Sequence, residues 1–263
     1  MKESKIGLEK SLVIGSEYIL TDDPKEVSKP LVVRGVIKKD HVESCIRNNR
    51  DFYYIDTGYF GNFPSPANPG GKKIFHRVVK NENQHSTIKD VPDDRWKKIQ
   101  EQDPKLKWQG WKNYDKKILL VMPNPKACKY YNHNYDTWVD NTKKQISEII
   151  DLPIEVRIKG SRTYRNREYS IYDAFDSGVY ATVAFNSIAA VESVLYGIPA
   201  FVSVPCAASP ISSMNLKNLN NPFKPDLETI NKQAANLAYG QFTLDEITSG
   251  TAWKMINRYE TSS

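Results

Sequence analysis

The sequence predicts an α/β protein built from two halves. Strand-like runs rich in branched apolar residues alternate with segments of helical spacing along most of the 263 residues. This order is typical of strand–helix–strand units. The clearest unit runs from Val179 to Val204, where two apolar strands flank a short helix that ends at Gly197-Ile-Pro199. Such a crossover requires that its two strands be parallel.

The first half is expected to cover residues 1–112. Branched and aromatic apolar content predicts its strands, and helical spacing predicts its helices. In chain order these are a strand over 31–37, a helix over 41–49, strands over 51–60 and 74–79, and a helix over 93–102. A loop rich in Pro, Gly and Asn at 62–71 interrupts them, and the Trp-rich stretch 108–114 reads as a linker.

The second half is expected to cover residues 113–240. Its predicted elements are a strand over 117–122, a helix over 135–150, a strand over 154–159, a helix over 170–175, a strand over 179–185, the short helix that ends at Gly197, and a strand over 200–204. Two helices, 226–238 and 243–258, are expected to follow. This order predicts a doubly wound sheet, which binds ligands at the carboxyl ends of its strands.

Composition excludes several classes of protein. The chain is 40% apolar but has no run of about 18 apolar residues, so no membrane span is expected. Its first residues lack the apolar stretch of a signal peptide, which favours a cytoplasmic location. Cys45, Cys128 and Cys206 are widely spaced and are expected to be buried, reduced thiols. The four His show no zinc-ligand spacing, so we expect no metal.

The charge is uneven. The chain carries a formal net charge of +6, and many of its cations lie among aromatic residues between 72 and 117. Basic residues interleaved with aromatics suit a nucleic-acid surface, where phosphates are neutralised and bases are stacked. A solvated basic face with the aromatics packed inward explains the same pattern. The interleaved residues are Lys72, Lys73, Phe75, His76, Arg77, Lys80, Arg95, Trp96, Lys97, Lys98, Lys105, Lys107, Trp108, Trp111, Lys112, Tyr114, Lys116 and Lys117.

The turn after the strand 179–185 is the main candidate binding site. Asn186, Ser187 and Ile188 occupy it, and Ser187 is a natural N-cap for the helix that follows. Free backbone N–H groups and the positive end of the helix dipole make such a turn a phosphate site. Glu192 lies further along the same helix and is a second candidate. A solvated helix carboxylate is the alternative interpretation of Glu192.

Cations follow the neighbouring predicted strand. Arg157 and Lys159 alternate with apolar residues, so both point to one face near the carboxyl end of that strand. In a parallel sheet this end lies beside the Asn186–Ser187 turn, where cations suit a pyrophosphate. Asn124 follows the first strand of this half and is a weaker candidate for the same pocket. A basic loop in solvent is the competing explanation for the cations.

In the first half, Asp56 is the candidate general base. It lies at the end of the strand 51–60, and Gly58 lets the chain turn sharply behind it. Transfer of a group to a hydroxyl needs a base that removes the proton, and a carboxylate can serve. Asp before Thr-Gly is also a common turn former. Asp22 and Asp23 compete for the role, although the following Pro24 indicates a turn there.

A polar run follows the strand 74–79 and is a candidate acceptor-binding segment. Its candidate residues are His76, Arg77, Asn81 and His85. An ordinary surface loop accounts for these residue types equally well.

One motif resembles a known signature. Residues 186–199 read Asn-Ser-x-Ala-Ala-Val-Glu-x-x-x-x-Gly-x-Pro, which resembles the nucleotide-sugar-binding signature in the C-terminal half of GT-B glycosyltransferases. The match is closest to capsule-type sugar transferases and non-hydrolysing sugar-nucleotide epimerases. The resemblance implies two Rossmann-type halves facing a cleft and a C-terminal helix, within 241–263, crossing back to the first half. It also implies that Ser187 and its neighbours hold the donor phosphates, that Glu192 holds the ribose, and that a nucleotide-sugar is the co-substrate without a further cofactor.

Longer stretches resemble a narrower group. Residues 51–60, 76–81 and 237–253 resemble phage-encoded GT-B-type proteins, which include transferases of glucose or arabinose to 5-hydroxymethylcytosine in DNA. This resemblance implies a UDP-sugar donor, double-stranded DNA as the acceptor, and action in the host cytoplasm. Two alternatives remain open at this stage: a GT-B enzyme acting on a surface glycan or a sugar nucleotide, and a non-catalytic DNA-binding protein.

Overall fold

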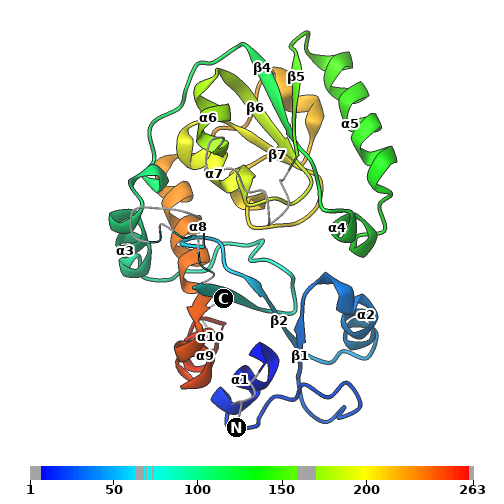
Figure 1. The fold of residues 1–263 in the computed structure, drawn as a ribbon, viewed down its shortest axis with the longest axis vertical. Helices are drawn as coiled ribbons and strands as arrows, with labels where there is room; N and C mark the ends of the chain where they lie inside the picture. The colour runs from blue at the N-terminus through cyan, green and yellow to red at the C-terminus, as the bar shows by residue number, and fades with distance from the viewer. Residues whose placement is uncertain are drawn as a thin grey trace. The chain divides into compact units, whose positions relative to one another are not determined.

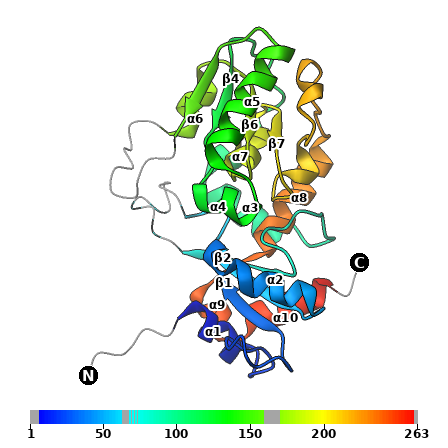
Figure 2. The same cartoon turned by 90° about the vertical axis from the view of Figure 1, so that its right-hand side faces the viewer.

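The computed structural model describes residues 7–62, 68, 70, 72, 74–158 and 170–260. It divides into two compact units, the first made of Met1–Gln102 with Ala234–Ser263 and the second of Asp103–Gln233. Each unit contains a four-stranded sheet with helices packed against it, as Figure 1 and Figure 2 show from two directions. The predicted α/β class is confirmed.

The sheet of the first unit is mixed. Its strand order is β1-β2-β3-β8, in which β1 and β2 are parallel and the other pairs are antiparallel. A Rossmann-type sheet is parallel throughout, so in this unit only the β1–β2 pair follows the expected arrangement. The strands are β1 (Leu31–Arg34), β2 (Phe52–Thr57), β3 (Phe75–Lys80) and β8 (Gln241–Thr243). The last of them was not predicted, because three residues carry too little periodicity to distinguish a strand from a helix start.

The C-terminal segment returns to the first unit, as expected. Helices α9 (Leu244–Thr248) and α10 (Thr251–Glu260) pack with α1 (Leu8–Gly15), and Figure 1 shows the three together. Buried Leu12, Ile55 and Phe242 belong to the core beneath them. The remaining helices of this unit are α2 (Lys39–Arg47) and α3 (Asp94–Gln102), while α8 (Leu227–Tyr239) contains the division between the units.

The expected single helix over 243–258 is wrong. Two helices occupy this range, and they are separated at Gly250, whose φ is 81°. A Cβ on Gly250 would lie 2.5 Å from the carbonyl oxygen of Gly15 in α1. The left-handed backbone and the close approach to α1 both require glycine, so a tertiary contact ends the helix here.

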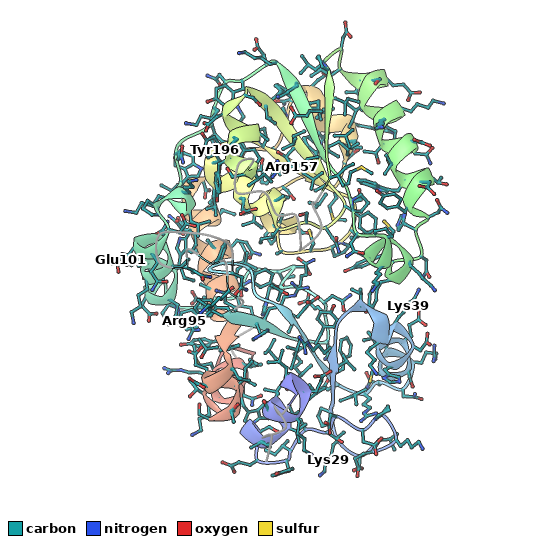
Figure 3. All side chains as sticks on the ribbon, viewed as in Figure 1. Lys29, Lys39, Arg95, Glu101, Arg157 and Tyr196 are labelled. Atoms are coloured by element: carbon teal, nitrogen blue, oxygen red, sulfur yellow. The ribbon has the colours of Figure 1, made fainter. Side chains whose placement is uncertain are left out.

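Arg95 connects α3 to the returning segment. Its guanidinium donates to Glu246 at 2.7 Å and to the carbonyl oxygen of Gln241 at 2.8 Å. Figure 3 shows Arg95 in this unit. Burial alone would raise the pKa of Glu246, but hydrogen bonds from Arg95 and from Thr243 outweigh it and lower that pKa. These contacts join residues about 150 positions apart in the chain.

The sheet of the second unit is fully parallel. Its strand order is β5-β4-β6-β7. The strands are β4 (Lys117–Val121), β5 (Ile154–Arg157), β6 (Val179–Ala184) and β7 (Ala200–Val202), close to the predicted ranges. From β4 the chain crosses to β5 on one side, whereas from β6 it crosses to β7 on the other. The direction of winding therefore reverses between β4 and β6.

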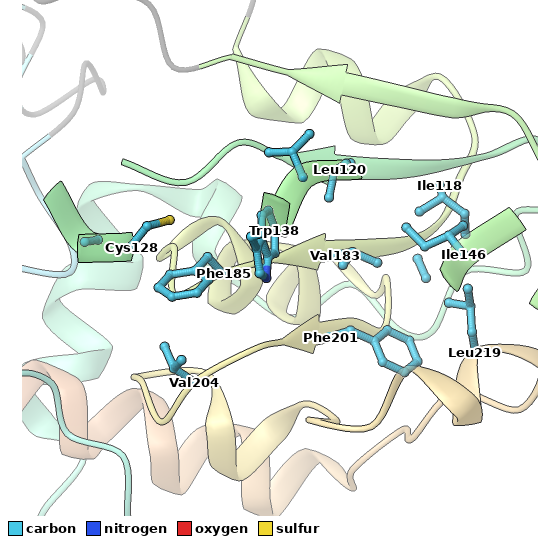
Figure 4. Packing of buried hydrophobic residues seen from close by; sticks show 13 residues of the cluster. Ile118, Leu120, Cys128, Trp138, Ile146, Val183, Phe185, Phe201, Val204 and Leu219 are labelled. Atoms are coloured by element: carbon cyan, nitrogen blue, oxygen red, sulfur yellow. The ribbon is translucent and has the colours of Figure 1, made fainter. Parts of the chain in front are cut away.

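Helices cover both faces of this sheet. On one face, α5 (Tyr135–Ile149) packs with buried Ile118, Val183 and Phe201, the cluster drawn in Figure 4. On the other face, Ser193 of α7 (Ala189–Tyr196) donates to Thr182 of β6 at 2.8 Å. Thr182 alternates with Val183, so α5 and α7 lie on opposite faces, as a doubly wound sheet requires. The shorter helices are α4 (Pro125–Tyr130) and α6 (Ile171–Asp176).

The Trp-rich stretch belongs to the second unit, although it was expected to be a linker between the halves. The N–H of Lys112 donates to the carbonyl oxygen of Gly197 at 2.7 Å, and that of Lys116 donates to Gly178 at 3.2 Å. Gly178 and Gly197 precede β6 and β7, so residues 110–116 lie at the amino-terminal edge of the sheet. The residues before them pack on α7, where the N–H of Gln109 donates to the carbonyl oxygen of Leu195. We call residues 104–116 the strap.

Candidate functional site

The switch in winding between β4 and β6 defines the candidate site. Val121 of β4 pairs in register with Ala184 of β6 and with Arg157 of β5. Asn124 and Asn186 follow Val121 and Ala184 by three and two residues, so both lie at the carboxyl edge of the sheet. Open doubly wound sheets bind ligands in the crevice at such a point.

The turn between β6 and α7 presents free donors. The backbone N–H groups of Ser187 and Ile188 are half-buried and have no hydrogen-bond partner among the described residues. Ser187 is not the N-cap as expected, because the helix begins at Ala189 and Ile188 occupies the cap position. The Ser187 hydroxyl nevertheless accepts the N–H of Ala189 at 3.3 Å. Two adjacent N–H groups at a helix start can receive an anion.

Asn124 follows β4, which pairs with β6, whereas Arg157 ends β5, which β4 separates from β6. Arg157 is therefore not on the strand next to the turn, contrary to the expectation from sequence. The Asn124 side-chain oxygen caps α4 by accepting the N–H of Lys126 at 2.9 Å, which leaves its amide hydrogens without a partner among the described residues. Arg157 is half-buried at the end of β5, and Figure 3 shows it in the second unit. Its charge contributes to a lowered pKa of Asp173, after the larger effect of hydrogen bonds with Ser170. Lys159 lies outside the described residues.

Glu192 is a half-buried carboxylate on α7 rather than a fully solvated one. Burial raises the pKa of Tyr172 on α6, and the negative charge of Glu192 raises it further. The two side chains are therefore electrostatic neighbours. The Tyr172 ring also packs on Tyr196 and lies beneath the ammonium group of Lys105, 5.1 Å from its centroid. Nothing in the sequence pattern indicated Tyr172, because its contacts come from helices separated along the chain.

Asp56 is at the end of β2, as predicted, but its oxygens have partners. Oδ2 accepts from Arg77 at 3.3 Å and from the Tyr54 hydroxyl at 3.2 Å, and Oδ1 accepts the N–H of Thr57 at 2.7 Å. Its side chain remains 37% exposed. The competing Asp23 accepts the N–H of Lys25 at 2.9 Å, which is the turn its sequence indicated. Asp56 thus combines a structural ion pair with access to solvent.

The structure does not gather the four acceptor candidates into one open surface. Asn81 has φ 58° and joins the strand ends by accepting from Phe52 at 2.9 Å and donating to Asp51 at 2.7 Å. The Arg77 guanidinium donates hydrogen bonds to the Asp56 carboxylate and to the carbonyl oxygens of Thr57 and Asn83. His76 is half-buried in β3, where it pairs with Thr57 of β2 on one side and with Phe242 of β8 on the other.

His85 is a core residue. Its side chain is 8% exposed, Nδ1 lies 2.9 Å from the Tyr59 hydroxyl, and its ring packs against Gly240. Burial lowers the pKa of His85 to about 3, with smaller contributions from Lys89 and Arg77. The imidazole is therefore neutral at physiological pH. Its position fits a structural role better than acceptor binding.

The basic aromatic region is divided between the units. Trp96 is 2% exposed and packs on Phe60 in the first unit. In the strap, Trp108 and Trp111 contact each other edge to face. Trp96 is thus a core residue and Trp108 and Trp111 are half-buried, whereas Lys107 and Lys116 are exposed and have no carboxylate partner among the described residues. The alternative interpretation, a solvated basic face, describes this region better than a base-stacking platform.

Three further features are limited to the described part of the chain. No group of three His, Cys, Asp or Glu side chains there could hold a metal. Cys45, Cys128 and Cys206 are free and buried, as predicted. No described helix has the length and apolar character needed to cross a bilayer.

Comparison with known proteins gives a distant likeness of fold. No protein-family model and no curated protein matches the sequence. Among solved structures, the β Kdo 2,4 transferase of Thermosulfurimonas dismutans KpsC is similar, with a TM-score of 0.49 and 10% identity over 90% of this chain and 89% of that chain. The β Kdo 2,7 transferase of the same KpsC has a TM-score of 0.47 and 12% identity over 86% of each chain. At this level of similarity no residue role, donor or acceptor is transferred from those enzymes to this chain.

Proposed function

We propose that this protein is a glycosyltransferase that moves a sugar from a UDP-sugar to a hydroxyl group, with 5-hydroxymethylcytosine in double-stranded DNA as the acceptor. The observation that carries the proposal is the winding reversal between β4 and β6, where Asn124 and the free N–H groups of Ser187 and Ile188 follow neighbouring strands and Arg157 ends β5 at the same edge of the sheet. The resemblance of residues 186–199 to a nucleotide-sugar signature supports the donor class.

The roles follow from the chemistry. The N–H groups of Ser187 and Ile188, with Arg157 and Lys159, would receive the diphosphate, and Glu192 would accept hydrogen bonds from the ribose. The acceptor oxygen attacks the anomeric carbon while the bond from that carbon to the diphosphate oxygen breaks. Cations and oriented N–H groups stabilise the negative charge that develops on the departing diphosphate. Asp56 would take the proton from the acceptor hydroxyl.

The proposed acceptor follows from sequence resemblance and from charge. Residues 51–60, 76–81 and 237–253 resemble phage DNA glycosyltransferases, and the protein carries a net charge of +6. A base inside a duplex must be flipped out before its substituent can react. The aromatic rings that would stack on it are buried or half-buried, so the strap lysines offer charge rather than stacking.

A direct assay tests the whole proposal. The protein is incubated with DNA that contains 5-hydroxymethylcytosine and with a panel of UDP-sugars, and the digested nucleosides are analysed by mass spectrometry. We expect a mass increase of one sugar residue on hydroxymethylcytosine and none on DNA that contains cytosine. UDP binding without any modified nucleoside would retain the donor site and reject the acceptor. Absence of UDP binding would reject the enzyme as a whole.

A further inference from the structure

A groove opens on the second unit, on the face of the sheet that carries α5. It runs between α5 and the segment Met214–Lys217 and has a volume of about 730 Å³. The predicted donor residues do not line it. Small-molecule sites have volumes of roughly 300–1,000 Å³, so the groove is large enough for a ligand of several rings.

The lining combines polar and apolar side chains and is almost free of charge. Among the described residues that line the groove, Glu148 and Lys217 carry opposite charges and His133 is the one titratable imidazole. The protein as a whole has a formal net charge of +6, so this neutrality is local. Five of the lining residues carry carboxamides: Asn132, Asn134, Asn141, Gln145 and Asn215.

Three of these carboxamides form one stripe on α5. Asn134 precedes the helix, and Asn141 and Gln145 follow at spacings that place them on the same face, together with Thr137. Asn215 lies on the opposite side of the groove. The groove is therefore bordered by carboxamides on both sides.

Their hydrogen-bonding groups are available. The oxygens of Asn134 and Asn215 accept the backbone N–H of Thr137 at 2.9 Å and of Lys217 at 3.1 Å. This leaves the two amide hydrogens of each without a partner among the described residues. Asn141 and Gln145 are exposed, and neither side chain is hydrogen-bonded within the described part of the chain. A carboxamide donates two hydrogen bonds and accepts others, a set that matches vicinal hydroxyl groups.

The floor is apolar. Val183 and Phe201 are each 1% exposed, and Figure 4 shows both in the cluster beneath α5. The side chain of Met214 is 52% exposed beside them and provides an accessible apolar surface. Sugar rings combine a face of C–H groups with a rim of hydroxyls, so an apolar floor bordered by carboxamides is complementary to them.

Other ligand classes fit less well. Nucleic acid needs several cations for its phosphates, and Lys217 is the one that the described lining offers. A peptide added as a strand would need the free edge of β7. That edge is occupied by Ser213, which accepts the N–H of Val202 at 2.9 Å and donates to Ala200 at 3.0 Å.

We infer that this groove binds a neutral oligosaccharide through residues other than the predicted donor residues. The inference depends on the lining of the groove and is independent of whether the protein transfers sugars. It assigns the face of the second unit that carries α5 to carbohydrate binding.

The test measures binding of neutral oligosaccharides to the full-length protein. Hexamers of glucose, galactose, mannose, arabinose and N-acetylglucosamine are titrated by calorimetry, with a sulfated hexamer as the charged comparison. We expect at least one neutral hexamer to bind and the double variant Asn141→Leu/Gln145→Leu to weaken it at least tenfold. Leucine is a good helix former and both positions are exposed, so the helix should be retained.

Matched controls distinguish the groove from general effects. The double variant Gln109→Leu/Asn113→Leu makes the same replacements at exposed positions of the strap and should leave the affinity unchanged. In the wild-type protein, the side-chain amide NMR signals of Asn141 and Gln145 should shift on titration. The inference is overturned if no neutral hexamer binds, if the sulfated hexamer alone binds, or if both double variants bind like the wild type. UDP affinity, measured in parallel, reports on the transfer site alone.

Discussion

At the scale of single residues, Glu192 shows how burial changes the interpretation of a helix carboxylate. It is half-buried on α7 and contributes, after burial itself, to the raised pKa of Tyr172. A solvated carboxylate would be screened by water and would have little effect on a neighbour. Its environment is thus compatible with a polar ligand in contact with it.

Replacing Glu192 with Gln tests the donor role. The variant keeps the size of the side chain and removes its charge, and hydrogen bonds to charged groups contribute about 1.5–3 kcal/mol. We therefore expect UDP to bind at least tenfold more weakly, measured by calorimetry. Glu148→Gln on α5 is the matched control and should leave UDP affinity unchanged. Equal affinities for the wild type and Glu192→Gln would remove Glu192 from the site.

Replacing Asp56 with Asn tests the proposed base. General bases contribute roughly 10²–10⁴-fold to rate, so turnover should fall by at least about 100-fold while UDP affinity is retained. The lost ion pair with Arg77 is partly exposed, and such pairs contribute about 0–1 kcal/mol to stability, so the variant should still fold. A Michaelis constant and turnover number close to those of the wild type would assign Asp56 a structural role alone.

The buried His85 predicts a dependence of stability on pH. Its pKa is about 3 in the folded protein, against about 6.5 for an unperturbed histidine in the unfolded chain. Between these values the unfolded state binds the extra proton, so the contribution of His85 is complete above pH 6.5 and decreases as the pH falls toward 3. A difference of one bound proton between the two states changes the free energy of unfolding by about 1.4 kcal/mol per pH unit.

Urea unfolding between pH 7 and pH 4 measures this dependence. The wild type should lose stability more steeply than His85→Asn, because the variant lacks the titrating group. The difference in slope isolates the histidine from carboxylates that titrate in both proteins. Parallel slopes would show that His85 is protonated in the folded protein.

At the scale of elements, the C-terminal end of α7 is in contact with the strap. Gly197 has φ 91°, and a Cβ there would lie 1.8 Å from the carbonyl oxygen of Gly110 in the strap. The same glycine accepts the N–H of Lys112. The end of the motif helix is therefore also the attachment point of the strap.

Gly197→Ala should destabilise the second unit. The left-handed conformation alone costs about 1–2 kcal/mol for a residue with a Cβ, and displacement of the strap adds to it. Gly35→Ala is a useful comparison, because Gly35 has φ 75° but nothing within 4 Å of an added Cβ. Thermal unfolding should show a larger loss for Gly197→Ala. Equal losses would mean that the strap moves freely away from the helix.

Topology separates Lys112 and Lys116 from the Asn186–Ser187 turn. These lysines lie at the amino-terminal edge of the sheet, whereas the turn lies at the carboxyl edge. β6 has six residues, so the two edges are about 20 Å apart. If Lys112 and Lys116 contact DNA, they contact phosphates at a distance from the Asn186–Ser187 turn.

At the scale of the whole molecule, net charge predicts how DNA binding responds to salt. Each lysine that neutralises a phosphate contributes about 0.9 to the slope of log affinity against log salt concentration. Replacing Lys107, Lys112 and Lys116 with Gln should lower this slope by up to about 3 and leave UDP affinity unchanged. Lys126, Lys143 and Lys144, changed together, provide a control of equal charge. If both triple variants lower the slope equally, the strap has no special part in DNA binding.

Much of the second unit could be predicted from sequence. β4, β5, β6, β7 and the helices between them were expected close to their observed limits, because branched apolar runs and helical spacing are local signals. The position of Asn124, Arg157 and Asn186 at or just after strand ends followed from the same pattern. Which strands are neighbours did not, since β4 pairs with β6 across about 60 residues of chain.

The first unit was predicted less completely. α1 and β8 were missed, and His85 was placed in an acceptor segment. Each error concerns a contact between distant parts of the chain: α1 packs on α9, β8 pairs with β3, and Gly240 lies against the His85 ring. No local pattern encodes such contacts.

The sequence by itself determined the α/β class, most strand and helix positions, and the residue types gathered in the 186–199 motif, because these depend on side-chain periodicity and on the backbone preferences of glycine and proline. Tertiary structure alone decided the strand order, the winding reversal that brings Asn124 beside Asn186, the partners of Asp56, and the carboxamide groove. Burial and long-range pairing produce these features, and both are properties of the packed chain rather than of any segment of it.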